Sequence, residues 1–370
     1  MNKKIITSVS TLLILGTFLI LNSCSNNAKK SNTSSEPSTS KEEVQSAVYA
    51  SNIIPFFNNW NLILGDGSNV GKAINFEHKD FFYTANDGIS NWIVFKAPNG
   101  GDTHGTSNNT RTELAQTKKW YPKTANDKLT ATLKVMNVSA TGDARVAASY
   151  AVVVGQIHSA DKHENEPLKI FYKKFPGHTK GSVFWHYEIN TEGEDNSGRW
   201  DYSTAVWGHD FSVVGTEANT YPEEPIDGIA LGEEFSYEIE VKDGIMTLKF
   251  ISEGHETKTF SKNLIVSEYT TTADIPEQTQ KLFVPIGQDG VERKNGYAGE
   301  GLFFKLGAYN QTNGKSPEVN KNWCSGAETH GGDIKKQYED GNYAEVWFKT
   351  GSIYVSDDAV SNEGYFTKND

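Results

Sequence analysis

The sequence predicts an all-β protein of the β-sandwich or jelly-roll type, and three observations lead to this prediction. Several segments alternate apolar and polar residues with a period of two, which is the pattern of a strand with one buried face. Glycines, 33 in all, and many Asn, Asp and Thr residues separate these segments, as is typical of turns. Long stretches with helical periodicity are scarce. An aromatic content of 12% supplies enough apolar bulk for one large core.

The N-terminus predicts export. Lys3 and Lys4 precede the apolar stretch IITSVSTLLILGTFLIL, in the order of a secretory signal peptide. The next residues, Leu-Asn-Ser-Cys at 21–24, resemble the lipobox of bacterial lipoproteins, in which the cysteine becomes the lipidated first residue. We therefore expect a lipoprotein signal peptide over residues 1–23, lipidation of Cys24, and a membrane-anchored protein in the periplasm or at the cell surface. The alternatives are an ordinary signal peptide and an uncleaved membrane anchor.

The rest of the chain divides into a tether and one domain. Residues 24–47 are mostly Ser, Asn, Lys and Glu, which cannot bury enough apolar surface to fold, so they predict a flexible tether. Residues 48–370 contain no second linker and no internal repeat, which favours a single β domain, expected to be a monomer. The one remaining cysteine, Cys324, has no partner once Cys24 is lipidated, and we interpret it as a small buried residue.

The net charge of −12 argues against a nucleic-acid partner, because binding a phosphate backbone requires a basic surface. An anionic substrate stays possible if basic residues gather in one groove. Any such substrate has to be argued from particular side chains.

Three expected strand regions have clear patterns. KLTATLKVMNV places Leu129, Ala131, Leu133 and Val135 on one face. FSYEIEVKDGIMTLKFI predicts a hairpin that turns at Asp243 and Gly244. NYAEVWFKTGSIYVS, near the C-terminus, predicts another pair of strands.

Three further strands carry polar residues on one face. In VVVGQIH, Gln156 and His158 share a face, and the strict alternation places Val152 and Val154 on that face and Val153, Gly155 and Ile157 on the other. Arg111 and Glu113 share a face in NNTRTELAQ, opposite Thr112 and Leu114. In GLFFKLGAYNQ the polar face holds Lys305, Gly307, Tyr309 and Gln311. Taken singly, these patterns also fit a structural histidine, a surface ion pair and a solvated strand face.

If the three faces belong to one sheet, they form a site of Arg, Gln, His, Lys and Tyr side chains with Glu113 as its acid. Arginine and glutamine can bind a carboxylate, and tyrosine or histidine can move protons. Gly307 would let a ligand approach the backbone closely. This set suits an anionic sugar.

RTEL, QIH and FFKLGAYNQ, in this order over about 200 residues, resemble the three signature segments of the alginate lyases of polysaccharide lyase family 7. The resemblance implies a β-jelly roll with a substrate cleft on its concave sheet. It also implies β-elimination on a polymer of uronic acids, without a cofactor or a metal.

In that mechanism Arg111 and Gln156 would bind the carboxylate next to C5 and stabilise the enolate-like transition state. Tyr309 would be the general acid toward the C4 oxygen, and for mannuronate also the base; His158 would be the base for guluronate. Glu113 would orient Arg111, and Lys305 and Gln311 would contact substrate. Cationic neighbours such as Arg111 and Lys305 would favour a phenolate.

The sequence departs from the family pattern at two positions. Ala115 stands where many members have a second arginine, so one substrate contact is missing or supplied elsewhere. Phe303 replaces the usual first tyrosine of the third segment, which we expect to alter packing only.

Three segments are expected to wall off one end of the cleft and to favour exolytic action. They are the long stretch after His158, the stretch NNWNLILGDG, and the region NWCSGAETHGG. The first also resembles the corresponding region of exo-acting members of the family. An endolytic lyase on alginate or another polyuronate is the alternative.

Other functions fit the sequence less well. A glycoside hydrolase needs two carboxylates facing the scissile bond, and no strand shows that pattern. A metalloenzyme would have to bind its catalytic metal through DKHENE, with Asp161, His163, Glu164 and Glu166, but a zinc site would need a spaced pair of histidines, which is missing here. Binding of a structural calcium ion by these residues is the alternative. A non-catalytic carbohydrate-binding lipoprotein would not need both His158 and Tyr309.

Overall fold

The computed structural model describes residues 48–54, 57–104, 107–160, 166–189, 200–265, 297, 300–356 and 360–361. Those from Val48 onward belong to one compact unit, Ala47–Asp370. The expected signal peptide, tether and lipidation site fall at residues 1–47, outside the described residues. No helix in the described part of the chain is long and apolar enough to cross a membrane.

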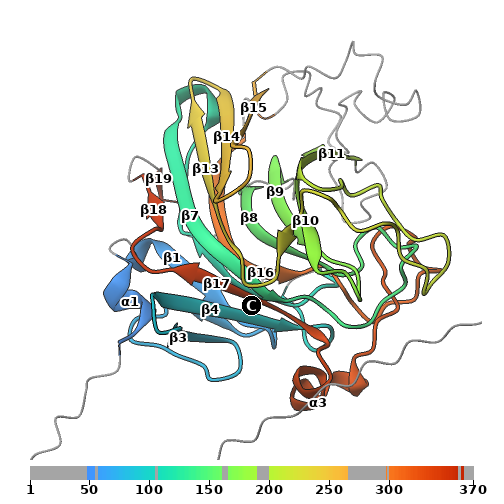
Figure 1. Cartoon of the computed structure of the whole chain (residues 1–370). Coiled ribbons are helices and arrows are strands. Elements are labelled where there is room, and N and C mark those ends of the chain that lie inside the picture. Colours follow the sequence, from blue (N-terminus) through green and yellow to red (C-terminus); the bar gives the residue numbers. More distant parts are fainter. Residues whose placement is uncertain are drawn as a thin grey trace, which may run out of the picture. The chain divides into compact units, whose positions relative to one another are not determined.

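The regular secondary structure of the described residues lies almost entirely in two β-sheets, which pack as layers (Figure 1). Within these residues sheet A has nine strands, in the spatial order β11-β10-β9-β8-β16-β5-β1-β2, with β12 beside β10. Their bounds are β1 Trp60–Ile63, β2 Asn69–Gly71, β5 Arg111–Gln116, β8 Ala151–Ser159, β9 Leu168–Lys173, β10 Lys180–Ile189, β11 Trp200–Trp207, β12 Ile229–Ala230 and β16 Leu302–Asn310.

Sheet B, again within the described residues, has eight strands in the order β15-β14-β13-β7-β17-β4-β3, with β18 beside β7. Its bounds are β3 Phe82–Asn86, β4 Asn91–Pro98, β7 Asn126–Asn137, β13 Glu234–Lys242, β14 Ile245–Ser252, β15 Lys258–Asn263, β17 Tyr343–Lys349 and β18 Tyr354–Val355. A short pair, β6 Lys118–Lys119 and β19 Val360–Ser361, lies apart. The short helical pieces are α1 Ala50–Ile53, η1 Phe57–Asn59, η2 Pro122–Thr124, η4 His330–Gly332 and α3 Ile334–Glu339.

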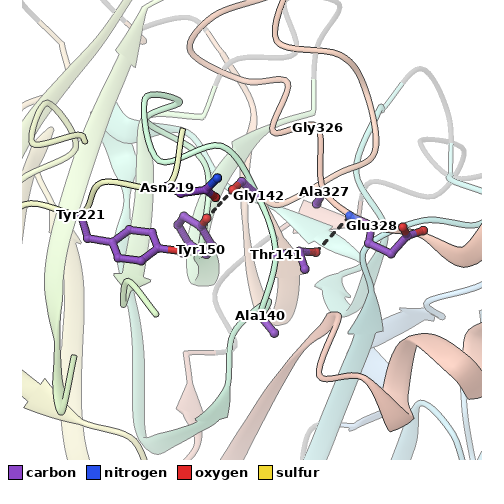
Figure 2. A pocket seen from close by; sticks show the side chains of 9 residues that line it. All are labelled: Ala140, Thr141, Gly142, Tyr150, Asn219, Tyr221, Gly326, Ala327 and Glu328. Carbon is purple, nitrogen blue, oxygen red and sulfur yellow. Dashed lines mark hydrogen bonds between the residues drawn. The ribbon is translucent and has the colours of Figure 1, made fainter. Parts of the chain in front are cut away.

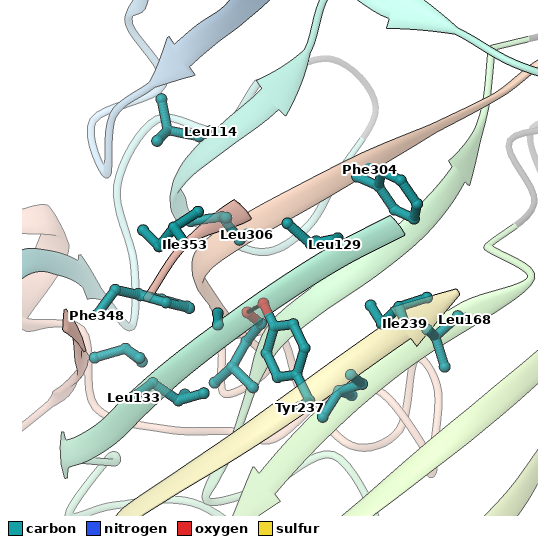
Figure 3. Packing of buried hydrophobic residues seen from close by; sticks show 14 of the residues in the cluster. Leu114, Leu129, Leu133, Leu168, Tyr237, Ile239, Phe304, Leu306, Phe348 and Ile353 are labelled. Atoms are coloured by element: carbon teal, nitrogen blue, oxygen red, sulfur yellow. Dashed lines mark hydrogen bonds between the residues drawn. The ribbon is translucent and has the colours of Figure 1, made fainter. Parts of the chain in front are cut away.

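The main core lies between the two sheets (Figure 3). Leu114, Phe304 and Leu306 come from sheet A, and Leu129, Leu133, Tyr237 and Phe348 come from sheet B. All of these side chains are almost fully buried. Burial of this apolar surface, at about 25 cal/mol per Å², holds the sheets together. The fold class is thus the expected all-β sandwich of the jelly-roll type.

The period-two patterns translate directly into strand faces in sheet B. Leu129, Ala131, Leu133 and Val135 are buried in β7, as predicted. The hairpin β13–β14 turns at Asp243 and Gly244, which both have positive φ, as expected for a tight two-residue turn. The prediction of a strand pair in NYAEVWFKTGSIYVS was right about the strands and wrong about their pairing. Both β17 and β18 pair with β7 and not with each other.

The predicted face pattern of β8 was wrong in its first half. Val152 and Val154 point into the main core with Ile157, whereas Val153 packs on the other side with Phe171. The cause is a β-bulge between Val153 and Gly155, where the register with β9 and β16 shifts. One extra residue moves the side-chain alternation by one, so Gln156 and His158 share a face with Val153.

Gly307 has a packing role that the sequence did not indicate. It has a φ of 150°, and a Cβ at this position would lie 2.4 Å from the Thr112 carbonyl oxygen and 2.8 Å from Glu113 Cα. Both atoms belong to the neighbouring strand β5, so the glycine allows close packing of β16 on β5. The predicted approach of a ligand at this glycine stays a prediction.

We predict that Gly307→Ala lowers the free energy of unfolding by more than about 3 kcal/mol, because the backbone of β5 would have to move. Gly254→Ala is the matched control: Gly254 also has positive φ, but no atom lies within 4 Å of its missing Cβ. It should lose only about 1 kcal/mol, from backbone strain. Equal losses in urea unfolding of the two variants would contradict this assignment.

Candidate active site

The three polar motifs lie on adjacent strands of sheet A. Strand β16 lies between β8 and β5, so all three motifs meet side by side. The register pairs Tyr309 with Arg111, Gly307 with Glu113, and Lys305 with Gln156. Neighbouring residues of the same strands, such as Leu114, Ile157 and Leu306, fill the core. The polar side chains therefore occupy the face of sheet A that points away from sheet B, which we call the site face.

Glu113 is the centre of the site's charge arrangement. Its carboxylate accepts a hydrogen bond from Gln156 Nε2 and lies 2.5 Å from Lys305 Nζ and 3.7 Å from Arg111 Nη1. Glu113, Gln156 and Lys305 are buried. Burial lowers the pKa of Lys305, and the negative charge of Glu113 opposes this shift. One carboxylate thus holds three groups from three strands, and the predicted partner Arg111 is one of them.

Tyr309 is fixed on two sides. The Arg111 guanidinium carbon lies 3.9 Å from the centre of the Tyr309 ring, and Ser107 Oγ lies 3.1 Å from the phenol oxygen. Lys305 Nζ is 6.0 Å from the same ring centre. A cation over the ring face and a hydroxyl at the phenol oxygen restrict the orientation of this side chain.

Gln311 follows the end of β16 and folds back onto it. Its Nε2 donates to the Tyr309 carbonyl oxygen at 3.3 Å, and its backbone N–H donates to the Ala151 carbonyl at 3.0 Å. The side chain is buried. In this structure Gln311 therefore anchors the segment that carries Tyr309.

His158 is buried, and this burial lowers its pKa to about 4. Lys305 and Arg111 lower the pKa further, while Glu166 raises it. The imidazole is therefore neutral near pH 7. Its Nδ1 lies 2.7 Å from the Ser159 carbonyl oxygen, so the neutral ring donates from Nδ1 and keeps Nε2 as an acceptor. Phe303 packs on the His158 ring at 5.3 Å, in line with its expected packing role.

A buried ionic network, which sequence reasoning missed, continues from His158 along the site face. Glu166 Oε1 lies 3.4 Å from His158 Nε2, and Glu166 Oε2 lies 3.6 Å from Lys169 Nζ. Lys169 also pairs with Glu188 and, at 3.2 Å, with Asp201. Asp201 in turn lies 3.0 Å from His186 Nδ1.

Aromatic side chains cover this network. Trp323 lies 5.4 Å from Lys169 Nζ and 6.4 Å from the His186 ring, and its ring centre is 4.9 Å from that of Phe211. Trp323 belongs to the stretch NWCSGAETHGG that was expected to form a wall. Its neighbour Cys324 is buried, as predicted.

The other two expected wall segments have a different structure. The stretch after His158 contains β9 and β10, and NNWNLILGDG contains β1, so both extend sheet A. Only a strong run such as LKIFY, with β-branched and aromatic residues, could have signalled β9 in advance. Lys169, His186, Glu188 and Asp201 are spread over three strands, so no local spacing pointed to their network.

A pocket of about 370 Å³ lies between loops, one of which leads through Tyr150 into β8 (Figure 2). Its walls come from residues 140–142, Tyr150, Asn219, Tyr221 and residues 326–328. Tyr150 donates to the Gly142 carbonyl, and the Glu328 N–H donates to Thr141 Oγ1. None of the residues on the site face lines this pocket. We therefore place the candidate chemistry on sheet A and not here.

The site face offers carboxylate binding and proton transfer. Arg111 and Gln156 supply donors, Tyr309 supplies a hydroxyl, and neutral His158 supplies an acceptor nitrogen. Of DKHENE, only Glu166 lies within the described residues, and in them no group of three or more His, Cys, Asp or Glu residues could hold a metal ion.

Comparisons with known proteins agree with this arrangement. A family model for alginate lyase matches residues 54–355. An alginate lyase of Klebsiella pneumoniae is 28% identical over 304 residues, covering 70% of this chain and 83% of that protein. The crystal structure of that organism's alginate lyase has a TM-score of 0.57 at 22% identity, covering 84% of this chain and 98% of that one. The crystal structure of the exolytic PL7 alginate lyase AlyA5 from Zobellia galactanivorans has 61% identity and a TM-score of 0.76, covering 85% of this chain and 98% of that one.

We predict that Glu113→Gln destabilises the domain by about 3 kcal/mol, because Lys305 and Arg111 would lose their buried counter-charge. Glu256→Gln is the control, since Glu256 pairs with Lys258 on the surface and its side chain is 76% exposed. Urea unfolding of both variants measures the difference. A Glu113→Gln variant as stable as the control would show that the charge of Glu113 does not stabilise the domain.

Proposed function

Because the chain belongs to the alginate lyase family, we propose that it cleaves the 1,4-glycosidic bond of alginate by β-elimination and leaves unsaturated uronate ends. The protein is thus a polysaccharide lyase, and its partner is an anionic polysaccharide. One observation carries the assignment of residues: the motifs of β5, β8 and β16 bring Arg111, Gln156, His158 and Tyr309 onto one face around Glu113.

The geometry suggests how these groups divide the reaction. The C5 proton is weakly acidic while the neighbouring carboxylate is charged, so Arg111 and Gln156 bind that carboxylate and stabilise the charge that develops on it. A base removes the C5 proton, its electron pair forms the C4–C5 double bond, and the C4–O bond breaks. Tyr309 protonates the leaving oxygen.

The base differs with the sugar. In guluronate the C5 proton lies on the opposite face from that in mannuronate, so His158 takes it in guluronate and Tyr309 in mannuronate. His158 suits this role because burial keeps it neutral, with a pKa of about 4. Lys305 and Glu113 support the carboxylate site, and Gln311 holds the end of β16 in place.

Exolytic cleavage is the second part of the proposal. AlyA5, 61% identical to this chain, is described as exolytic. Trp323 and Phe211 pack on His186 of the site face, and we expect them to block a long polymer there. A covered end favours cleavage at chain ends. An endolytic lyase stays the alternative, and the combination of His158 with Tyr309 disfavours a non-catalytic binding protein.

We predict that the domain starting at Ala47 raises the ultraviolet absorbance of alginate solutions, and that Tyr309→Phe lowers this rate at least 100-fold through loss of the general acid. Solution viscosity should fall slowly while absorbance rises, because cleavage at ends shortens chains little. Tyr354→Phe is the control, since Tyr354 lies on sheet B and is exposed. A rapid early loss of viscosity would support endolytic action, and an active Tyr309→Phe variant would refute the assigned acid.

We also propose that residues 1–23 form a lipoprotein signal peptide, that Cys24 carries the lipid and that residues 24–47 form a flexible tether, so that a monomeric domain, residues 48–370, works at a membrane surface. The lipobox-like residues 21–24 and the polar composition of 25–47 support this proposal. Lipid anchoring would keep the enzyme near the cell while it degrades exported polysaccharide.

We predict that Cys24→Ala moves the enzyme from the membrane fraction to the soluble exported fraction, because the lipid can no longer be attached. Fractionation with an antibody, together with labelling by a radioactive fatty acid, measures this. Cys324→Ala is the control, since Cys324 is buried in the domain. Unchanged membrane association of Cys24→Ala would overturn the lipoprotein proposal.

A further inference from the structure

The ionic network beside His158 is unusual for a site that binds a polyanion. Its carboxylates belong to Glu166, Glu188 and Asp201, and its central cation is Lys169. Buried charges are costly unless they are paired, so a network of this kind on a functional face calls for a physical reason. The three carboxylates of this network would repel the carboxylates of a substrate, so the network is unsuited to binding them. Its contact with His158 points instead to a role in proton transfer.

His158 lies between opposing charges. On one side Lys305 and Arg111 disfavour its protonated form, and on the other side Glu166 favours that form. Glu166 Oε1 lies 3.4 Å from Nε2, the ring nitrogen that stays an acceptor while Nδ1 donates to the Ser159 carbonyl. Glu166 is therefore the acidic side chain, among the described residues, that contacts the nitrogen receiving a proton.

We propose that Glu166 is a positioning residue that raises the basicity of His158 and stabilises its imidazolium during proton removal from guluronate. This inference rests on the proposed lyase function and deepens it. When His158 Nε2 takes the C5 proton, a positive charge appears next to Lys305 and Arg111. The Glu166 carboxylate offsets that charge, while the C4–C5 double bond forms and Tyr309 protonates the leaving oxygen.

Lys169 holds the Glu166 side chain in position. Its Nζ lies 3.6 Å from Glu166 Oε2, and Glu188 and Asp201 hold the same ammonium group from β10 and β11. The backbone N–H of Glu166 also lies 3.4 Å from Glu188 Oε1. The network therefore fixes Glu166 from two sides, so that one carboxylate oxygen is directed to the histidine.

The inference separates the two sugars. On mannuronate Tyr309 is the base and His158 stays neutral, so the charge of Glu166 should matter little. On guluronate Glu166→Gln should lower kcat about ten-fold or more with little change in KM, because a weaker base transfers the proton more slowly. Short oligoguluronates and oligomannuronates, followed by the absorbance of the unsaturated product, measure this split.

The pH profile gives a second readout. Activity on guluronate needs neutral His158 and is lost as the pH falls through the pKa of that residue, about 4. Because Glu166 raises this pKa, Glu166→Gln should move the acid limb of the guluronate profile to lower pH. Lys305 and Arg111, the cations that face His158, stay in place, so the direction of the shift is set by the lost carboxylate.

Three comparisons complete the test. Glu166→Asp keeps the charge and should restore part of the guluronate rate. Glu233→Gln makes the same chemical change in a histidine pair directly before β13 of sheet B, where Glu233 Oε1 lies 2.9 Å from His255 Nε2, and should change neither rate. In a His158→Asn background Glu166→Gln should cause no further loss on guluronate, because its effect acts through His158.

Equal losses on both sugars, an unmoved acid limb, or a further loss in the His158→Asn background would overturn the role of Glu166. A wild-type enzyme that releases no unsaturated product from either oligomer would refute the proposed function and this inference with it. An active wild type with a Glu166→Gln variant that behaves like Glu233→Gln would refute the inference alone.

Discussion

The buried carboxylate of Glu113 is the interaction on which the site depends. Lys305, Arg111 and Gln156 come from strands that are far apart in the sequence, and each contacts this one group. Without it, two cations would face each other in a poorly solvated place, at a cost of several kcal/mol. With it, the donors are held in position before a ligand arrives, which reduces the reorganisation that a reaction would require.

The two faces of sheet A have separate tasks. The inner face packs on sheet B through apolar side chains such as Leu114 and Leu306 and fixes the register of the strands. The outer face uses the same register to align charged and hydroxyl groups. Strands β9, β10 and β11 enlarge this outer face beyond the three motifs and add the Lys169 network, and Trp323 lies over Lys169. The stability of the core thus determines the precision of the site.

Much of this arrangement could be predicted from sequence, because a period of two translates directly into strand faces. It worked for Leu129 to Val135, for the turn at Asp243 and Gly244, and for the alternation around Arg111 and Tyr309. It failed at Val152 and Val154, because a bulge before Gln156 shifts the alternation and the sequence does not signal it. It also missed Lys169, Glu188 and Asp201, because ion pairs between strands leave no periodic signal. Side-chain alternation can be read from a short stretch of sequence, whereas the partners of a side chain on neighbouring strands cannot.

The bulge in β8 divides this strand into two parts with different relations to the rest of the chain. Before it, Val152 and Val154 belong to the core; after it, Gln156 and His158 belong to the site face. A single-residue insertion between this bulge and Gln156 would shift the alternation once more and turn both polar side chains into the apolar interior, even though every residue of the QIH motif would remain. Sequence comparison that scores motifs without counting the residues before them would therefore overlook such an inactive relative. In this strand, the number of residues before the motif determines which face Gln156 and His158 occupy, as much as the identity of the residues does.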